Sequence, residues 1–421
     1  MKLAHLGLLA LLPLLGGATV GAATYERPDV VPPQFFGLVM HRALTTTAWP
    51  PVAFGSWRLW DNYVRWTDLE PSRNGWRFAD FDRMVALGRD HRVEMLYTLG
   101  QTPAWASSRP DEKFVYGLGA GSAPADMLDF GRYVEAVATR YKGAIAAYQV
   151  WNEPKIAAGK PCGGVVFFCG SQDELVSLTR SARAALKRAD PAARLIGPSF
   201  AGGLAGVRHL DQYLEAGAAP LLDAVSFHLY LAQPEEGFAV LRAIRAALAR
   251  NGVPNLPIWN TEVGYLIQND DNTVASQQPG GVFSKVLTPR DGAAYLARTM
   301  LVSAAGGVER VHWYAWDNSK MGAISTATGK PNEVGVAFGV MQHWLVGSRV
   351  RCSGESTEWS CDLQRGGRTA TISWRTDGKD SNPLARDAVV ERLDGTRANV
   401  SAGKLPESLG RPYLLSDGRP W

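Results

Sequence analysis

The sequence predicts an α/β protein: a (β/α)8 TIM barrel followed by a small C-terminal antiparallel β domain. Short apolar runs typical of buried strands alternate with amphipathic runs typical of helices, and residues suited to chemistry stand at the ends of most of those strands. Such alternation indicates a parallel sheet whose faces are covered by helices. Past about residue 346, short β-type runs separated by turn residues replace this pattern, which predicts the second domain.

Eight apolar runs are the expected barrel strands: 35–41, 56–61, 93–100, 146–153, 194–200, 223–230, 257–265 and 310–317. The expected helices between them are 78–90, 127–141, 172–188, 237–250 and 290–305, where apolar residues such as Leu175, Leu178 and Leu186 recur on one helical face. An open doubly wound sheet is the alternative. Functional residues on most strand ends, rather than at one switch point, favour closure.

The C-terminal runs 350–353, 358–363, 369–375, 388–393 and 412–415 predict a β-sandwich-like appendage. It is either a glycan-binding module or a sandwich packed on the barrel, and its shortness favours the packed sandwich. The expected domains are a signal peptide over 1–23, the catalytic barrel over 24–345 and the appendage over 346–421. The signal consists of Met1-Lys2, an apolar run over 6–15 and small residues up to Ala23.

The compartment follows from this N-terminus. The apolar run is shorter than the roughly 20 residues that span a bilayer, and no later segment is long and apolar enough to cross one, so we expect a secreted or periplasmic protein without a membrane span. The formal net charge of +4 is dispersed along the chain, which gives no nucleic-acid footprint.

Four cysteines form two close pairs, Cys162 with Cys169 and Cys352 with Cys361. In an exported chain this spacing predicts two local disulfides, and thus a disulfide-bonded protein. A zinc site is the competing interpretation. Because Cys-x-x-Cys spacing and partner histidines are absent from the sequence, we expect no metal and no cofactor.

Two carboxylates carry the functional prediction. Glu153 ends the segment Tyr148-Gln149-Val150-Trp151-Asn152-Glu153, and Glu262 ends Pro257-Ile258-Trp259-Asn260-Thr261-Glu262. Each apolar strand therefore presents a glutamate at the rim of the sheet, where barrel active sites are built. Two such acids facing one cavity supply the proton donor and the nucleophile of glycosidic bond cleavage. The expected substrate is thus a carbohydrate, and the expected class of protein is a glycosidase. The alternative interpretation is that these are two unrelated surface glutamates.

Asn152-Glu153-Pro154 resembles the Asn-Glu-Pro acid/base motif on strand 4 of the clan-A glycoside hydrolases, which are retaining (β/α)8 enzymes. The resemblance covers residues 33–345. With Thr102-Pro103-Ala104-Trp105 it is most like glycoside hydrolase family 39, which includes β-xylosidases, α-L-iduronidases and hydrolases of bacterial exopolysaccharides, although family 5 shares most motifs. It implies that Glu153 is the acid/base and that Glu262 is the nucleophile. Nearby negative charge on Glu262 is expected to raise the pKa of Glu153.

The resemblance also implies roles for surrounding side chains. Asn152 would bind the sugar 2-hydroxyl, and Tyr230 would donate to the nucleophile. Arg58, a costly charge within a strand, would hold the nucleophile ionised. A salt bridge from Arg58 to Asp61 or Glu94 is the structural alternative.

Histidines and tryptophans complete the expected site. His228 lies two residues from Tyr230 and on the same strand face. It would contact the substrate or the hydrogen-bond network around the nucleophile, and the alternative is a purely structural role. His41 is balanced between a sugar hydroxyl contact and structure. Trp316 matches the clan's platform under the reactive sugar, with Trp105 as the second candidate, because sugar faces stack on aromatics. For each tryptophan taken alone, core packing is the alternative, and Trp313 is expected to point elsewhere.

The sequence therefore predicts a secreted retaining glycoside hydrolase that cleaves O-glycosidic bonds of a poly- or oligosaccharide by double displacement, with endo action on a bacterial exopolysaccharide as the preferred substrate hypothesis. A β-xylosidase-type exo-glycosidase, a transglycosylase and a non-catalytic glycan-binding protein on the same scaffold are the alternatives. Gly-x-Ser-x-Gly, Walker and His-Glu-x-x-His motifs are absent from the sequence, which weakens serine hydrolase, phosphoryl-transfer and zinc-protease chemistry.

Overall fold

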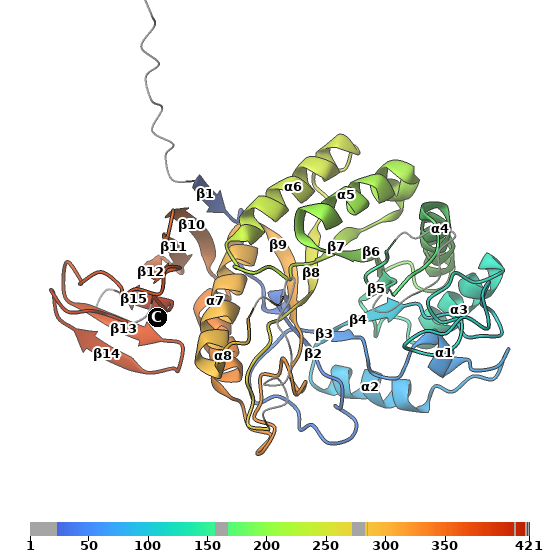
Figure 1. Cartoon of the computed structure of the whole chain (residues 1–421), viewed down its shortest axis with the longest axis horizontal. Helices are drawn as coiled ribbons and strands as arrows, with labels where there is room; N and C mark the ends of the chain where they lie inside the picture. Colours follow the sequence, from blue (N-terminus) through green and yellow to red (C-terminus); the bar gives the residue numbers. More distant parts are fainter. Residues whose placement is uncertain are drawn as a thin grey trace, which may run out of the picture.

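The computed structural model describes residues 23–155, 167–271, 283, 285–407, 410–416, 419 and 421. Eight parallel strands close into a barrel, with β9 hydrogen-bonded back to β2, and helices surround it (Figure 1). The strands are β2 (Phe36–Val39), β3 (Ser56–Leu59), β4 (Glu94–Leu99), β5 (Ala147–Val150), β6 (Arg194–Ala201), β7 (Ala224–His228), β8 (Ile258–Val263) and β9 (Val308–Trp313). The predicted (β/α)8 barrel is confirmed, and an open sheet is excluded.

Each predicted helix is present: α2 (Ala79–Asp90), α3 (Met127–Arg140), α4 (Gln172–Ala189), α6 (Glu236–Arg250) and α7 (Pro289–Ala305). Three more were not predicted, namely α1 (Trp66–Leu69), α5 (Gly203–Tyr213) and α8 (Glu333–Leu345). Helix α7 is buried on nearly every side, because the barrel lies on one flank and the β domain on the other. This sandwiching explains why residues on all sides of the helix are buried from Gly292 to Ala305, with the buried Arg298 paired to Glu235.

The β domain is one antiparallel sheet of seven strands in the order β1-β10-β11-β12-β15-β13-β14. Its members are β1 (Ala23–Glu26), β10 (Arg349–Glu355), β11 (Glu358–Arg365), β12 (Arg368–Arg375), β13 (Ala388–Arg392), β14 (Arg397–Val400) and β15 (Tyr413–Ser416). The sequence did not predict β1 or β14, and it suggested a sandwich where the structure has one sheet. Strand β1 pairs with β10, so residues ahead of the barrel complete a domain that follows it.

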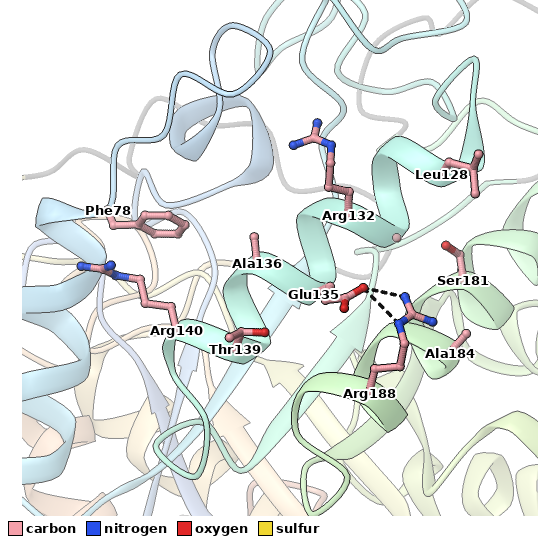
Figure 2. Close-up of a pocket in the computed structure, with 11 residues that line it drawn as sticks. Phe78, Leu128, Arg132, Glu135, Ala136, Thr139, Arg140, Ser181, Ala184 and Arg188 are labelled. Carbon is pink, nitrogen blue, oxygen red and sulfur yellow. Dashed lines mark hydrogen bonds and ion pairs between the residues drawn. The ribbon is translucent and has the colours of Figure 1, made fainter.

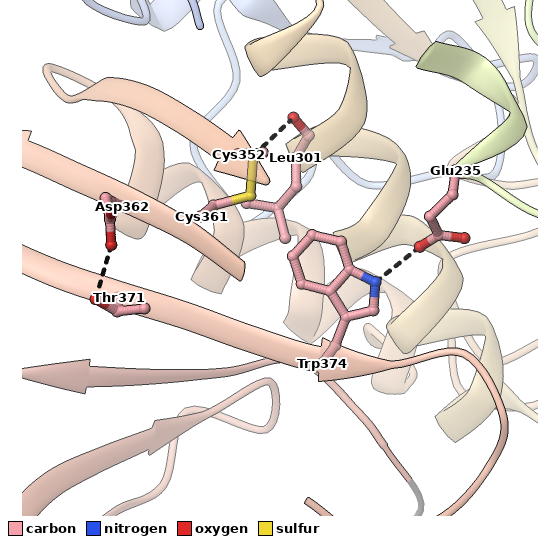
Figure 3. Close-up of a disulfide and its surroundings, with 7 residues drawn as sticks. All are labelled: Glu235, Leu301, Cys352, Cys361, Asp362, Thr371 and Trp374. Atoms are coloured by element: carbon pink, nitrogen blue, oxygen red, sulfur yellow. Dashed lines mark hydrogen bonds between the residues drawn. A yellow bond between two sulfur atoms is a disulfide. The ribbon is translucent and has the colours of Figure 1, made fainter. Parts of the chain in front are cut away.

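One face of this sheet packs on the barrel helices (Figure 3). The Trp374 indole donates to Glu235 at 2.7 Å, and the Cys352 sulfur lies 3.9 Å from the Leu301 carbonyl oxygen on α7. Cys352 and Cys361 form the predicted disulfide between directly opposed residues of β10 and β11. The other predicted bridge involves Cys162, which lies outside the described residues, as do positions 1–22 of the expected signal peptide.

Among the described segments, no helix has both the length and the hydrophobicity needed to cross a membrane.

Candidate active site

Glu153 and Glu262 meet at the C-terminal end of the barrel. Glu153 follows β5, and Glu262 lies near the end of β8. One carboxylate oxygen of each acid and one ring nitrogen of His228 all lie within 4.8 Å of one another. The Glu153 side chain is 24% exposed and the Glu262 side chain 9%. Two carboxyl groups at about this separation leave room for a sugar carbon between nucleophile and acid, but not for an intervening water.

Both oxygens of the Glu262 carboxylate are held by donors. Arg58 donates from Nη1 to Oε2 at 2.6 Å, and the Tyr230 hydroxyl donates to Oε1 at 2.8 Å. Burial raises the pKa of Tyr230 well above its ordinary value, and the charge of Glu262 adds to the effect, so the phenol remains a neutral donor. A positive charge and a hydroxyl directed at the two oxygens fix the orientation of this carboxylate and stabilise its negative charge.

Arg58 is fully buried and uses its guanidinium in three directions. Besides Glu262, it donates from Nε to Gln149 at 3.0 Å and from Nη2 to the Asn152 side-chain oxygen at 2.6 Å. The structural alternative for Arg58 is not what the structure shows, since Glu94 pairs with Arg310. The costly buried charge therefore has a charged partner and two polar ones.

Replacing Arg58 by lysine is expected to lower kcat/KM by roughly a hundredfold and the free energy of unfolding by about 3 kcal/mol. A lysine keeps the charge but cannot reach three acceptors in the fixed planar geometry of a guanidinium. Initial rates and urea denaturation measure the two effects. Arg73→Lys is the matched control, because Arg73 is 57% exposed and makes a comparable two-pronged contact to Asp129. Equal stability of the two variants would contradict the expectation.

Glu153 contacts His228, whose Nδ1 lies 2.6 Å from Oε1 of the acid. Burial raises the pKa of Glu153 to about 7; the positive charge of Arg58 opposes this, and the charge of Asp61 adds to it. The Glu262 charge was expected to do part of the raising; instead burial is the largest cause, and the carboxylate that adds to it is Asp61. Burial lowers the pKa of His228 to about 3, so its imidazole is neutral at ordinary pH. Glu153 is thus a carboxyl able to hold or release a proton near neutrality.

The backbone around Glu153 adopts an unusual conformation. Trp151 and Glu153 have φ values of 60° and 40°, in the left-handed region that residues with a Cβ rarely occupy. Glycine at position 100 permits the close packing of the Trp151 ring, because a Cβ there would lie 3.0 Å from it. The Glu153 amide donates to the Ser199 hydroxyl at 3.2 Å. Such local strain is maintained when surrounding contacts fix a functional side chain.

The structure also locates the predicted residues His41, Trp316 and Trp313. The His41 backbone amide donates to Asp317 at 2.8 Å, its ring contacts Tyr314 edge to face, and burial lowers its pKa. Trp316 is 1% exposed and Trp313 is fully buried, so both lie in the core near the barrel mouth. The platform role of Trp316 stays a prediction.

Trp105 is engaged elsewhere. Its indole donates to the Glu70 carbonyl at 2.8 Å, and its ring lies against Trp66 and under the Arg73 guanidinium. These contacts are structural, and none of those seen among the described residues joins Trp105 to the two acids. The core-packing alternative fits Trp105 better than the cleft.

Sequence reasoning missed several polar residues of the site. Gln149 lies inside β5 and contacts Arg58, Thr98, Ser226 and Thr261, and its place in an otherwise apolar strand was the signal that could have revealed it. Ser199, Tyr116 and Tyr314 were also missed, and Asp61 was considered only as a salt-bridge partner of Arg58, because no motif marks these residues. Hydrogen bonds thus join Glu262 through Arg58 to Gln149 and Asn152, whereas Asp61 is held separately by Tyr116 and Tyr314.

Known proteins match this chain in sequence and in fold. The family model of glycosyl hydrolase family 10 matches residues 56–195, which run from β3 to the start of β6 and include Glu153. A glucosidase from Croceicoccus marinus is similar with a TM-score of 0.60 at 16% identity, over 92% of this chain and 85% of that one. A family 30 endoxylanase from Clostridium papyrosolvens C71 has a TM-score of 0.59 at 11% identity, over 93% and 98%.

A family 44 endoglucanase from Clostridium acetobutylium ATCC 824 is similar to the same extent, with a TM-score of 0.58 at 12% identity over 92% of this chain and 97% of that one. At these identities the solved structures bear on the fold, and they cover the barrel and the β domain together. The family match and the paired carboxylates add the chemistry. The chain is a glycosidase, and its architecture is that of the retaining clan-A glycoside hydrolases.

Proposed function

We propose that Glu262 is the nucleophile and Glu153 the acid/base of a double-displacement glycosidase. The observation that carries this proposal is the approach of the two carboxylates to within 4.8 Å, one held by Arg58 and Tyr230 and the other buried with a pKa of about 7. The ionised acid suits attack on the anomeric carbon, and the protonated acid suits donation to the leaving oxygen.

In the first step, a Glu262 oxygen forms a bond to the anomeric carbon while the glycosidic C–O bond breaks and Glu153 gives its proton to the departing oxygen. In the second step, Glu153 takes a proton from water, the water oxygen bonds to the anomeric carbon, and Glu262 leaves as a carboxylate. Arg58 and Tyr230 stabilise Glu262 before attack and after release. Asn152 is placed beside this pair through its bond to Arg58, and we assign it the sugar 2-hydroxyl.

For the substrate, we propose internal cleavage of a polysaccharide, with a bacterial exopolysaccharide as the preferred candidate. Two structurally similar proteins are an endoxylanase and an endoglucanase by name, which supports endo action, whereas the glucosidase keeps exo action as the alternative. We also propose export of the protein, a hypothesis supported by the Cys352–Cys361 disulfide, because such bonds persist in oxidising compartments.

The stereochemistry of the product tests the mechanism. A panel of aryl glycosides identifies a substrate that the protein hydrolyses, and proton NMR then follows the anomer released first. Retention of configuration is expected. A 2-deoxy-2-fluoro glycoside with a good leaving group should label the protein, and peptide mass spectrometry should place the label on Glu262. Inversion, or a label elsewhere, would defeat the proposal, and turnover of no glycoside would favour the non-catalytic binding protein.

The cluster of Glu153, His228 and Glu262 has donor atoms close enough to surround a metal ion. Its donors are, however, already engaged: Glu262 accepts from Arg58 and Tyr230, and the His228 Nδ1 contacts Glu153. A buried arginine at 2.6 Å from a carboxylate oxygen occupies the position and supplies the charge that a cation would bring. The donor set therefore fits a metal-free glycosidase better than a metal centre.

Dialysis against a chelator such as EDTA is accordingly expected to leave kcat and KM unchanged within about twofold, because neither step uses a metal-bound oxygen. Added Mg²⁺, Ca²⁺ or Zn²⁺ should not raise the rate of the dialysed protein. Loss of activity on chelation that is restored by one divalent ion would contradict this prediction.

A further inference from the structure

The β domain is bonded to the chain segment that carries Tyr230. This segment, residues 229–235, leaves the barrel after β7 and leads into helix α6. Near its start, the Tyr230 hydroxyl donates to the Glu262 carboxylate. At its end, the Glu235 side chain is only 10% exposed. Glu235 takes no part in the two-step chemistry, so the burial of its charge needs another explanation.

The Glu235 carboxylate accepts hydrogen bonds from both domains. Arg298 on α7 donates from Nε to Oε1 at 2.7 Å and from Nη2 to Oε2. The Trp374 indole on β12 donates to Oε1 at 2.7 Å, as Figure 3 shows. Both donors are buried, with Arg298 6% and Trp374 2% exposed. Hydrogen bonds to a charged group are strong and directional, so these contacts hold Glu235 in one position.

Helix α7 also joins this segment to the one that follows Glu262. The Gln233 side-chain oxygen accepts from Arg298 at 2.9 Å and from the Tyr295 hydroxyl at 3.2 Å. The Tyr295 ring packs edge to face on Tyr265, with 4.9 Å between the ring centres. Tyr265 follows Glu262 closely along the chain. The segments after β7 and β8 are therefore attached to one helix.

Aromatic stacking extends the attachment into the β domain. The Trp374 ring lies nearly parallel to Trp359 of β11, at 12° and 6.1 Å between ring centres. Trp359 in turn stacks on Phe238 in the first turn of α6, at 15° and 5.2 Å. Residues 229–235 are thus fixed at one end by the barrel strand β7 and at the other by α7 and the β domain.

The catalytic importance of this anchor lies in Tyr230. A hydrogen bond that orients a reacting group must be held to within a fraction of an ångström by the residues around it. A short segment fixed at both ends has less conformational freedom than one fixed at a single end. Release of Glu235 would therefore let the Tyr230 hydroxyl leave the Glu262 carboxylate, and fewer molecules would be ready for attack at any moment.

We propose that Trp374 and Arg298 are positioning residues of the glycosidase. By fixing Glu235 they hold residues 229–235, and through this segment they keep the Tyr230 hydroxyl on the nucleophile. The β domain is then a part of the catalytic unit and not only an attached module. This inference rests on the proposed function and adds to it a role for the second domain.

The rate at which a 2-deoxy-2-fluoro glycoside labels Glu262 tests the proposal, because labelling reports the attack of the nucleophile alone. Trp374→Phe removes the indole N–H and keeps an aromatic ring. The maximal labelling rate should fall roughly three- to tenfold, and the glycoside concentration that gives half of this rate should stay within about twofold of the wild type. In a Tyr230→Phe background the same substitution should cause no further loss, because the hydroxyl that it positions is already absent. Equal losses in both backgrounds, or no loss in either, would overturn the proposal.

Trp344→Phe is the matched control. The Trp344 indole also joins the two domains, donating from α8 to Glu391 on β13 at 3.2 Å, and Trp344 is fully buried. Its replacement should lower the melting temperature about as much as Trp374→Phe does and leave the labelling rate at the wild-type value. Equal slowing of labelling by both substitutions would indicate general loosening of the domain interface and would contradict a specific role for Trp374.

Arg298→Lys provides the same test from the barrel side should Trp374→Phe not fold, and its effect should likewise vanish in the Tyr230→Phe background. Arg188→Lys is its control, because Arg188 donates from Nε and Nη2 to Glu135 on the outer helices α3 and α4 (Figure 2). It should label at the wild-type rate. A labelled wild type whose rate neither Trp374→Phe nor Arg298→Lys changes would defeat the positioning role alone. A wild type that no such glycoside labels would defeat the proposed function itself.

Discussion

Replacing Glu262 by alanine is expected to lower kcat by about four to six orders of magnitude on every glycoside that the protein hydrolyses. The glycosyl–enzyme bond forms on this carboxylate, and no neighbouring side chain can replace it, because Arg58 is a cation and the Tyr230 phenol stays protonated. Removing the carboxylate also leaves the buried Arg58 without its charged partner. Initial rates measure the loss, and thermal unfolding shows whether the variant remains folded.

Added azide tests specifically whether Glu262 is the nucleophile. In Glu262→Ala the small anion can enter the vacated space and attack the anomeric carbon directly, which yields a glycosyl azide of inverted configuration. Glu94→Gln is the matched control, since Glu94 opens β4 at the other end of the barrel and pairs with Arg310. It should keep wild-type kinetics. A Glu262→Ala variant with more than about one per cent of wild-type activity, or one whose azide product retains configuration, would exclude Glu262 as the nucleophile.

The barrel was predictable because buried parallel strands leave a strong mark in a sequence. Each strand is a mostly apolar run, and the structure places all eight within a few residues of the predicted limits. Helices α5 and α8 escaped prediction because glycines interrupt their apolar pattern. A Cβ at Gly206 would lie 2.2 Å from the Ala201 carbonyl oxygen, and one at Gly335 would lie 2.3 Å from that of Ala323. Tight packing against neighbouring backbone selected glycine there over better helix formers.

The site was predictable only where a strand end marks it. Arg58, Glu153, Tyr230 and Glu262 stand on barrel strands or directly after them, so their convergence follows from the fold. The negative charge of Asp61 helps to raise the pKa of Glu153. Asp61 is itself held by a hydrogen bond from Tyr116, a loop residue. Loop conformation is not encoded by hydrophobic periodicity, and no spacing rule brings Tyr116 and Tyr314 to one carboxylate. Residues that tune a site from loops therefore need a structure to be found.

Replacing Glu153 by glutamine is expected to lower kcat/KM by about two to four orders of magnitude for glycosides with poor leaving groups. Glutamine retains the size and the contact distance to His228 but cannot donate a proton to the departing oxygen. Glycosides with activated leaving groups, such as 2,4-dinitrophenolate, need no such proton and should lose much less in their first step. Comparing the two substrate types separates lost proton transfer from general damage to the site.

The pH profile supplies the second part of this prediction. Glu153 must be protonated in the free protein to act as an acid, and burial raises its pKa to about 7, so kcat/KM of the wild type should fall as pH rises through about 7. This descending limb should disappear in Glu153→Gln. Asp61→Asn removes a negative charge that favours the protonated form, so its limb should shift to lower pH.

Azide again distinguishes the roles. In Glu153→Ala the nucleophile is intact and the glycosyl–enzyme accumulates without a base to activate water, so azide should intercept it and give a glycosyl azide of retained configuration. That product is the opposite anomer to the glycosyl azide expected when Glu262 is removed. If Glu153→Gln kept the wild-type descending limb, the group that titrates would have to be another residue, and Glu153 would be excluded as the proton donor.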